Sequence, residues 1–221
     1  VPLEPDEIDV AEEFDEPGEP GEDDDDVRPS GPLQLAIIGR PNVGKSTLLN
    51  RLVGEERVLT GPEPGVTRDS ISVQWSWRDR PVKLVDTAGM RRRARVTEKL
   101  ELMSVADTLR AVQYANVAVL VLDGTVMAER QDLTIADHVI EEGRALVIAV
   151  NKWDLVTDPV DAMGRLRDRL MRSLPQIPDI PVVTFSALTG RGTEKLMPVV
   201  FEVYDLWNTR LSTGPLNRWL E

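Results

Sequence analysis

The segment from Gly39 to Ser46, GRPNVGKS, carries glycine, lysine and serine at a spacing that suits phosphate binding. It fits the pattern G-x-x-x-x-G-K-[ST] and lies between the apolar run LQLAII and the helix-like TLLNRL, as that motif requires. In such a loop, backbone N–H groups and the start of the next helix surround phosphate oxygens. Lys45 would reach the β- and γ-phosphates, and the Ser46 hydroxyl would ligate magnesium. This segment, the P-loop, therefore predicts a nucleoside triphosphate site.

Two further segments are candidates for the magnesium and γ-phosphate contacts. The motif DTAG follows the strand-like VKLV, so Asp86 would hold magnesium through a water molecule and the Gly89 N–H would bond the γ-phosphate. Taken alone, this motif is equally compatible with a turn. In the preceding loop TGPEPGVTRDS, Thr67 is the preferred second magnesium-ligating hydroxyl and Thr60 the competing one. Capping or simple exposure is the alternative for Thr67.

The motif NKWD follows the strand-like ALVIAV and indicates which base is bound. The Asp154 carboxylate can accept hydrogen bonds from the N1–H and the exocyclic amine of guanine, whereas adenine has no donor pair there. Asn151 would hold the neighbouring loop and reach the base edge, and the stem of Lys152 would lie on the ring. In the later motif SAL, the Ala187 N–H would bond the guanine carbonyl. The predicted nucleotide-binding residues are Asn42, Val43, Gly44, Lys45, Ser46, Thr47, Asn151, Lys152, Asp154, Ser186, Ala187 and Leu188.

These motifs need strands that end at one edge of a sheet. Short, continuous, β-branched runs predict buried parallel strands at 33–38, 117–122, 145–150 and 182–185. ISVQWSW alternates as a half-exposed strand does and would turn through RDRP (78–81) into VKLV. Apolar residues at helical spacing predict helices within 98–115 and 196–206. The fold class is therefore α/β, with a mostly parallel sheet, one antiparallel strand and helices on both faces.

The composition limits the classes of protein to which this chain can belong. The chain has 221 residues, 41% of them hydrophobic, and no cysteine, which excludes disulfides and thiolate zinc sites. Its apolar runs are too short to span a membrane and its N-terminus does not resemble a signal peptide, so we expect a cytoplasmic protein without a membrane partner. Residues 1–30 hold 14 of the 38 acidic residues and one of the 26 Lys and Arg residues. We expect this segment to be a disordered linker; an acidic decoy for a basic surface is the alternative.

Taken together, GRPNVGKSTLLNRL, PGVTRD, DTAGMRRRARV, NKWD and SALTG resemble the second G domain of the bacterial Der (EngA) family of ribosome-assembly GTPases. The tryptophan in NKWD, the basic run after DTAG and the ending WNTRLSTGPLNRWLE favour this family over the related Era and MnmE. The resemblance implies a P-loop GTPase fold with a six-stranded sheet. It also implies an acidic linker at 1–32, a G domain at 33–208 and the start of a KH-like domain at 209–221.

The same resemblance implies partners. They are guanine nucleotide (GTP or GDP), the large ribosomal subunit with its rRNA and, in a full-length protein, a first G domain and a KH-like domain; a monomer is expected. The arginine run RRRAR (91–95) would present positive charge to RNA or to the KH-like domain, because electrostatic binding to phosphates is strong but unspecific. A solvated loop is the alternative for this run.

The residues available for hydrolysis depart from the Ras-like template. Met90 follows DTAG where that template has a water-orienting glutamine, and no arginine finger is identifiable. GTPases of the group that the chain resembles use a potassium ion held by the P-loop asparagine, here Asn42; a turn-forming role is the alternative. The resemblance thus implies slow GTP hydrolysis with magnesium and potassium, and the expected catalytic residues are Lys45, Asn42, Thr67 and Gly89. A binding module without useful hydrolysis is the alternative function, whereas an adenine-nucleotide enzyme is opposed by Asp154.

Overall fold

The structure is a computed structural model that describes residues 31–54, 58–59, 73–85, 105–177, 179–209 and 213–220. All of them belong to a unit that begins at Gly31. The acidic residues 1–30 lie outside the described residues, so the linker and the domain limits near 32 and 208 stay predictions. Within the described ranges, no helix combines the length and the apolar character that crossing a membrane requires.

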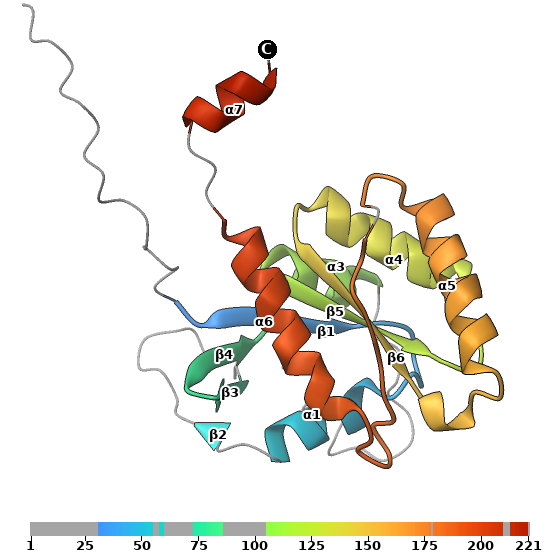
Figure 1. The fold of residues 1–221 in the computed structure, drawn as a ribbon. Coiled ribbons are helices and arrows are strands. Elements are labelled where there is room, and N and C mark those ends of the chain that lie inside the picture. The colour runs from blue at the N-terminus through green and yellow to red at the C-terminus, as the bar shows by residue number, and fades with distance from the viewer. Residues whose placement is uncertain are drawn as a thin grey trace, which may run out of the picture. The chain divides into compact units, whose positions relative to one another are not determined.

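Among the described residues, seven strands form one sheet in the order β2-β3-β4-β1-β5-β6-β7 (Figure 1). In chain order they are β1 (Leu33–Ile38), β2 (Val58–Leu59), β3 (Val73–Trp77), β4 (Arg80–Leu84), β5 (Val117–Asp123), β6 (Ala145–Asn151) and β7 (Val182–Thr184). β3 pairs antiparallel with β2 and β4, and the other pairs of described strands are parallel. The predicted fold class, with one antiparallel strand, is thus confirmed. The sheet has one strand more than the predicted six because the two-residue strand β2 extends its edge.

The described helices lie between the strands and after the last of them. They are α1 (Lys45–Gly54), α3 (Val105–Gln113), α4 (Arg130–Glu141), α5 (Pro159–Ser173), α6 (Leu196–Trp207) and α7 (Thr213–Leu220), with single 3-10 turns η1 (Trp153–Leu155) and η2 (Thr193–Lys195). The predicted helix within 98–115 corresponds to α3, and residues 98–104 lie outside the described part of the chain. Pro198 falls in the first turn of α6, where its missing N–H breaks no helical hydrogen bond.

Successive side chains of a strand point to opposite faces of the sheet, so the hydrophobic core has two parts, one on each face. Leu33, Leu35 and Ile37 of β1 pack in a cluster with α1 and α6, while Ala36 and Ile38 pack with α3, α4 and α5. β5 and β6 are buried almost throughout, which is why their sequences are apolar without alternation. Helices on both faces therefore hold the carboxyl ends of the central strands at a common edge (Figure 1).

The hairpin between β3 and β4 is tighter than the predicted turn at 78–81. Only Arg78 and Asp79 form the turn, with φ of 45° and 65°, as two-residue hairpins whose twist matches that of the strands require. Pro81 consequently lies inside β4, opposite Ser76. A proline is tolerated there because β4 pairs with β1 only from Val82 onward.

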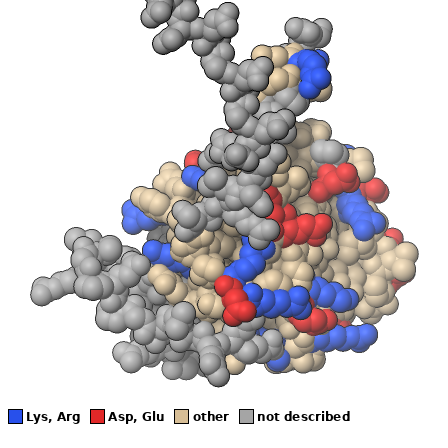
Figure 2. All heavy atoms as spheres, turned by 60° about the vertical axis from the view of Figure 1, so that its left-hand side comes forward, with Lys and Arg blue, Asp and Glu red and all other residues tan. Residues whose placement is uncertain are grey.

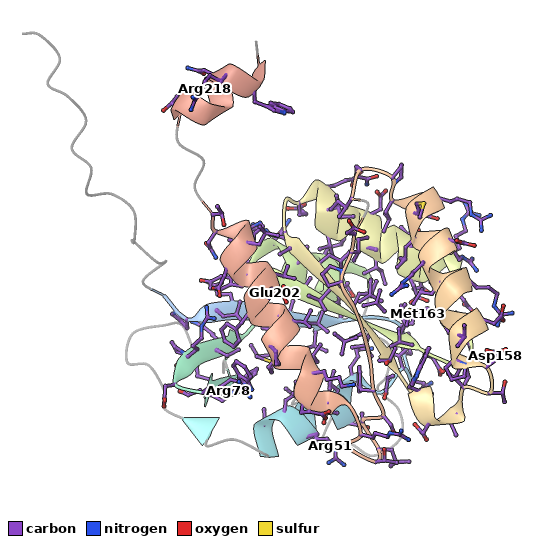
Figure 3. All side chains as sticks on the ribbon, in the orientation of Figure 1. Arg51, Arg78, Asp158, Met163, Glu202 and Arg218 are labelled. Atoms are coloured by element: carbon purple, nitrogen blue, oxygen red, sulfur yellow. The ribbon has the colours of Figure 1, made fainter. Side chains whose placement is uncertain are left out.

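Aromatic and charged side chains tie this hairpin to α6. The Trp77 and Phe201 rings stack with their centroids 5.2 Å apart. The Arg80 guanidinium lies 4.0 Å from the Phe201 centroid and pairs with both carboxylate oxygens of Asp205, at 2.5 and 3.0 Å. Arg78 covers the Trp77 ring at 4.6 Å, at the end of the hairpin (Figure 3).

We expect Arg80→Ala to lower the free energy of unfolding by about 1–2 kcal/mol, because it removes a bidentate ion pair and a cation–π contact that are both partly exposed. Arg78→Ala is the matched control, and loss of its single exposed ring contact should cost at most about 0.5–1 kcal/mol. Urea unfolding of both variants and the parent measures the difference. Equal costs would show that the contacts with Phe201 and Asp205 do not stabilise the hairpin.

Charges on the described surface are mixed in sign. On the face shown in Figure 2, Lys and Arg side chains alternate with Asp and Glu side chains, without a large field of one sign. The sequence agrees, because residues 31–221 contain 24 acidic and 25 basic residues. The net charge of −12 therefore originates in residues 1–30.

Candidate nucleotide site

Three of the predicted motifs lie at the carboxyl ends of parallel strands. The P-loop follows β1, NKWD begins at the last residue of β6, and SAL follows β7. Because these strands and β5 run parallel, the motifs meet at one edge of the sheet, where open α/β sheets bind ligands. Thr67, Asp86, Gly89, Met90 and the run 91–95 lie outside the described residues, so their roles stay predictions.

Two P-loop glycines are required by close approach to neighbouring strands. Gly39 has φ +137°, and a Cβ there would lie 2.4 Å from the Val121 carbonyl oxygen. Gly44 has φ +93°, and a Cβ would lie 2.2 Å from the Asn151 Nδ2. Asn42, between them, also has a positive φ (62°) and an exposed side chain. Asparagine tolerates this conformation better than most residues, so the geometry suits a turn residue and leaves the amide open to a ligand.

The polar groups of the P-loop lie at the start of α1. The Lys45 Nζ donates to the carbonyl oxygens of Gly39 and Arg40 (2.8 and 2.6 Å), so its ammonium lies across the loop. Ser46 and Thr47 are exposed in the first helical turn. An exposed hydroxyl there fits magnesium, a cation that prefers oxygen ligands and retains several waters. Within the described ranges, no group of three or more His, Cys, Asp or Glu side chains is arranged to hold a metal.

Asn151 joins the P-loop to the loop that contains SAL. Its Nδ2 donates to the Val43 carbonyl oxygen, and its Oδ1 accepts from the Ala187 N–H, both at 2.8 Å. Its backbone carbonyl accepts from the Gly124 N–H at 2.8 Å. Both Asn151 and Val43 are buried, so these hydrogen bonds fix the relative positions of the two loops. The bonds agree with the predicted loop-holding role of Asn151.

Lys152 is held by Asp123, an acid that is not among the predicted site residues. It adopts φ +58°, and its Nζ pairs with Asp123 Oδ2 at 2.6 Å. Asp123 also accepts from the backbone N–H and the hydroxyl of Thr125 (2.9 and 2.7 Å). Burial alone would raise the pKa of Asp123, but the bonds from Lys152 and Thr125 outweigh it and lower that pKa below its usual value. The position of Asp123 at the end of the strand-like run 117–122 is the signal that could have identified it.

Asp154 lies in the 3-10 turn η1, directly after Lys152 and Trp153. The Trp153 N–H donates to the Phe185 carbonyl oxygen (3.1 Å), which attaches this turn to the end of β7. The Asp154 side chain is exposed, and within the described residues its carboxylate forms no hydrogen bond or ion pair. The carboxylate is therefore available to a ligand at this edge.

The segment from Ser186 to Gly190, hereafter the SAL loop, is a closed turn. The Gly190 N–H donates to the Ser186 carbonyl oxygen (2.8 Å), and the Ser186 N–H donates to the Arg191 carbonyl oxygen (2.9 Å). Ser186 is buried, whereas the Leu188 side chain is 79% exposed. Of the three predicted residues in this loop, Ala187 makes the contact with Asn151, and Leu188 projects outward.

The P-loop is also attached to α4 by a partly buried ion pair that lies outside the predicted site residues. Arg40 Nε donates to both carboxylate oxygens of Asp132 (3.0 Å each), and Arg40 Nη1 pairs with Glu129 (2.6 Å). Asp132 is fully buried. Burial raises the pKa of Asp132, although the Glu129 N–H and Arg40 oppose this. No sequence signal connects these residues, because Arg40 and Asp132 are 92 positions apart.

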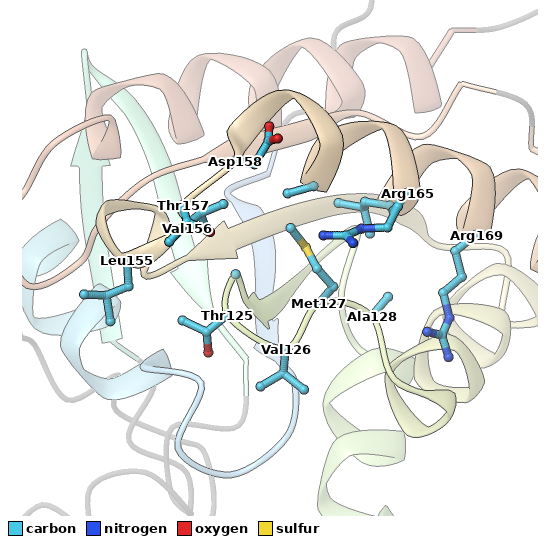
Figure 4. Close-up of a pocket in the computed structure, with 13 residues that line it drawn as sticks. Thr125, Val126, Met127, Ala128, Leu155, Val156, Thr157, Asp158, Arg165 and Arg169 are labelled. Carbon is cyan, nitrogen blue, oxygen red and sulfur yellow. The ribbon is translucent and has the colours of Figure 1, made fainter.

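A pocket of about 330 Å³ borders the turn η1 from the side of α5 (Figure 4). Its walls are the segment 124–128 after β5, the segment 155–158 after Asp154, and the α5 side chains Arg165 and Arg169 at its rim. Arg165 pairs with Asp161 on the same helix (2.9 Å). None of the described predicted site residues lines this pocket, so it is separate from the predicted nucleotide contacts.

Sequence comparison gives close relatives. A sequence model of the family described as "50S ribosome-binding GTPase" matches residues 34–152. GTPase Der from Parvibaculum lavamentivorans is 64% identical over 190 residues, which are 86% of this chain and 40% of that protein. GTPase Der from Agrobacterium fabrum is 52% identical over 217 residues, which are 97% of this chain and 46% of that protein. The predicted resemblance to the Der family is confirmed, and the chain spans less than half the length of these relatives.

Solved structures share the fold. Era from Aquifex aeolicus, bound to GDP·AlF4⁻, superposes with a TM-score of 0.56 at 24% identity, covering 77% of this chain and 56% of that one. Elongation factor SelB from Methanococcus maripaludis, in complex with the GTP analogue GppNHp, gives a TM-score of 0.57 at 17% identity, covering 82% of this chain and 35% of that one. At these identities the likeness concerns the fold alone, and it agrees with the predicted P-loop GTPase fold.

Proposed function

Because the chain belongs to the 50S ribosome-binding GTPase family, we propose that it is a switch domain that binds guanine nucleotides and hydrolyses GTP to GDP and phosphate. The observation that carries this proposal is the Asn151 bridge between the P-loop and the SAL loop. One buried side chain holds the phosphate-binding segment and the base-binding segment together, and three residues further along the Asp154 carboxylate has no partner among the described residues. Such a preformed edge suits a ligand that has both a base and phosphates.

In this proposal the base is selected by hydrogen bonds. Asp154 accepts from the N1–H and the exocyclic amine of guanine. The Ala187 N–H, which donates to Asn151 Oδ1 in this structure, turns to the guanine carbonyl when the nucleotide binds. Lys152 lies along the ring with its ammonium held by Asp123, and Ser186 and Leu188 shape the turn around the base. Adenine offers neither the donor pair nor the carbonyl, so it would leave polar groups unpaired.

The phosphates are bound by the backbone of the P-loop and by Lys45. The N–H groups at the start of α1 and the positive end of its dipole face the anion; the contributing residues are Asn42, Val43, Gly44, Lys45, Ser46 and Thr47. Magnesium would be held by the Ser46 hydroxyl together with Thr67 and Asp86, which lie outside the described residues. When bound, it supplies positive charge that offsets the charge developing on the phosphate oxygens.

Hydrolysis requires positive charge at the transition state. Lys45 supplies one such charge, and the Gly89 N–H would hold the γ-phosphate. Met90 cannot orient a water molecule as an amide does, so Asn42, whose amide is exposed beside the phosphate site, is proposed to hold a potassium ion. An amide oxygen is a suitable hard ligand for such a cation.

Single-turnover GTP hydrolysis is therefore expected to be at least about tenfold faster in KCl than in NaCl at equal ionic strength, since one correctly placed electrostatic group is worth about 10²–10³ in rate. Asn42→Ala should keep GDP binding and lose this potassium effect. Identical parent rates in the two salts, or an undiminished effect in the variant, would assign Asn42 to the turn only. No measurable turnover in either salt would favour the second candidate, a binding module without hydrolysis, which Met90 also permits.

The wider role that we propose is assembly of the large ribosomal subunit. The family description and the similarity to GTPase Der support it. In this reading a G domain at 33–208 lies between an acidic linker at 1–32 and the beginning of a KH-like domain at 209–221. A full-length monomeric, cytoplasmic protein would then bring a first G domain, the KH-like domain and this domain to ribosomal RNA. Co-sedimentation with large ribosomal subunits in GTP and in GDP tests this role.

A further inference from the structure

Arg51, on the last turn of α1, reaches across to the SAL loop. Its Nε donates to the Ala187 carbonyl oxygen (2.9 Å) and its Nη2 to the Leu188 carbonyl oxygen (3.0 Å). Figure 3 shows the side chain directed from α1 toward the segment that leads into α6. The planar guanidinium presents its N–H groups in a fixed fork, so two carbonyls that accept from it are held in one orientation.

The loop is shaped around this guanidinium. Gly190 has φ +84°, and a Cβ on it would lie 2.4 Å from Arg51 Nη1 and 2.9 Å from Arg51 Cζ. A side chain at this position would therefore displace the guanidinium or the loop. The Gly190 N–H in turn closes the loop on the Ser186 carbonyl oxygen (2.8 Å). Arg51 and Gly190 thus form one packed unit.

Ala187 is consequently held from two sides. Its N–H donates to Asn151 Oδ1, and its carbonyl oxygen accepts from Arg51. Asn151 also contacts the P-loop at Val43, and Arg51 belongs to the helix that the P-loop begins. Asn151 therefore fixes the Ala187 N–H and Arg51 fixes the peptide that follows it, and both residues are connected to the phosphate-binding segment.

We propose that Arg51 is a positioning residue for guanine recognition. It does not touch the nucleotide; by holding the Ala187 and Leu188 carbonyls it fixes the SAL loop at the base edge, and it aligns the base contact with the phosphate contact through α1. The Ala187 N–H, which donates to Asn151 Oδ1 in this structure, then has only to turn to the base carbonyl when a nucleotide binds. This inference rests on the proposed function, because it concerns the same base-binding edge. The signature of such a role is a change in discrimination at the base carbonyl rather than a uniform loss of affinity.

The test compares GDP with 6-thioguanosine diphosphate. The thio analogue keeps the N1–H and the amine for Asp154 but replaces the carbonyl by a weaker acceptor, so the parent should bind GDP about tenfold more tightly. In Arg51→Met this preference should fall below about threefold, mainly because GDP binds more weakly. Arg51→Lys keeps the charge without the fork and should be intermediate. Calorimetric titration of each protein with both diphosphates gives the ratios.

The matched control is Arg167→Met, which replaces an exposed arginine on α5 and should keep the parent's ratio of GDP to thio-analogue affinity. If Arg51→Met fails to fold, Gly190→Ala disturbs the same contact from the loop side and should reduce the ratio likewise. A parent-like ratio in the folded Arg51 variant, whether GDP affinity is kept or both affinities fall equally, would overturn the inference. A parent that binds the two diphosphates equally would overturn the assignment of the base site itself, and the inference with it.

Discussion

Asp154→Asn is expected to weaken GTP binding by at least about 10² and to raise the affinity for XTP above that of the parent, because sites built around a hydrogen bond discriminate strongly against bases that lack the partner. The asparagine amide cannot accept from the N1–H and the amine of guanine together. It can donate to the carbonyl that xanthine carries in place of the amine. Since the Asp154 side chain is exposed and free of partners within the described residues, the substitution should leave the fold intact.

Competition of GTP and XTP against a fluorescent nucleotide measures this change of base preference. Asp158→Asn is the matched control: this nearby carboxylate caps α5 by accepting from the Asp161 N–H (3.0 Å), and its loss should leave the base preference unchanged. A folded Asp154→Asn protein that binds XTP no better than the parent would contradict the assignment of the base contact.

Lys45→Ala should reduce the affinity for GTP by about 10²–10³, because charge-assisted hydrogen bonds to two phosphates are lost. In the structure the Lys45 ammonium lies over the carbonyls of Gly39 and Arg40. Those carbonyls are only partly buried, so water can donate to them once the ammonium is removed, and the nucleotide-free fold should lose less than GTP binding does. Lys45→Ala is therefore expected to lower the affinity for GTP much more than it lowers the stability of the nucleotide-free protein.

Calorimetric titration with GTP, together with thermal unfolding of the nucleotide-free proteins, checks this separation. The matched control is Lys195→Ala, which replaces an exposed lysine in η2 and should keep the parent's affinity for GTP. GTP affinity within about threefold of the parent in a folded Lys45→Ala protein would mean that the P-loop lysine does not face the phosphates.

The sheet could be predicted because the sequences of its central strands are typical of buried parallel strands. β5 and β6 are buried on both faces, so their sequences are continuously apolar and β-branched, and the motifs that follow β1, β6 and β7 then fall at one edge. The extra strand β2 has two residues, too few for periodicity to detect. The sequence predicts a turn at 78–81, whereas only Arg78 and Asp79 form the turn and Pro81 lies in β4.

The residues that the sequence could not identify act through distant partners. Arg51 contacts Ala187 across 136 positions, and Arg40 contacts Asp132 across 92. Charged side chains are ordinarily solvated, so composition alone gives no reason to single these out. Only the packing of α1 and α4 against the carboxyl edge of the sheet brings them to the loops that they hold.

The central claim is that this edge of the sheet is a guanine-nucleotide site, and nucleotide competition tests it most directly. A fluorescent GDP analogue bound to the purified protein, with magnesium present, is titrated with unlabelled GTP and with ATP. We expect GTP to displace the analogue at a concentration at least about 10²-fold lower than ATP, because only guanine pairs with Asp154 and the Ala187 N–H. Displacement by both nucleotides at the same concentration, or by neither, would contradict the claim.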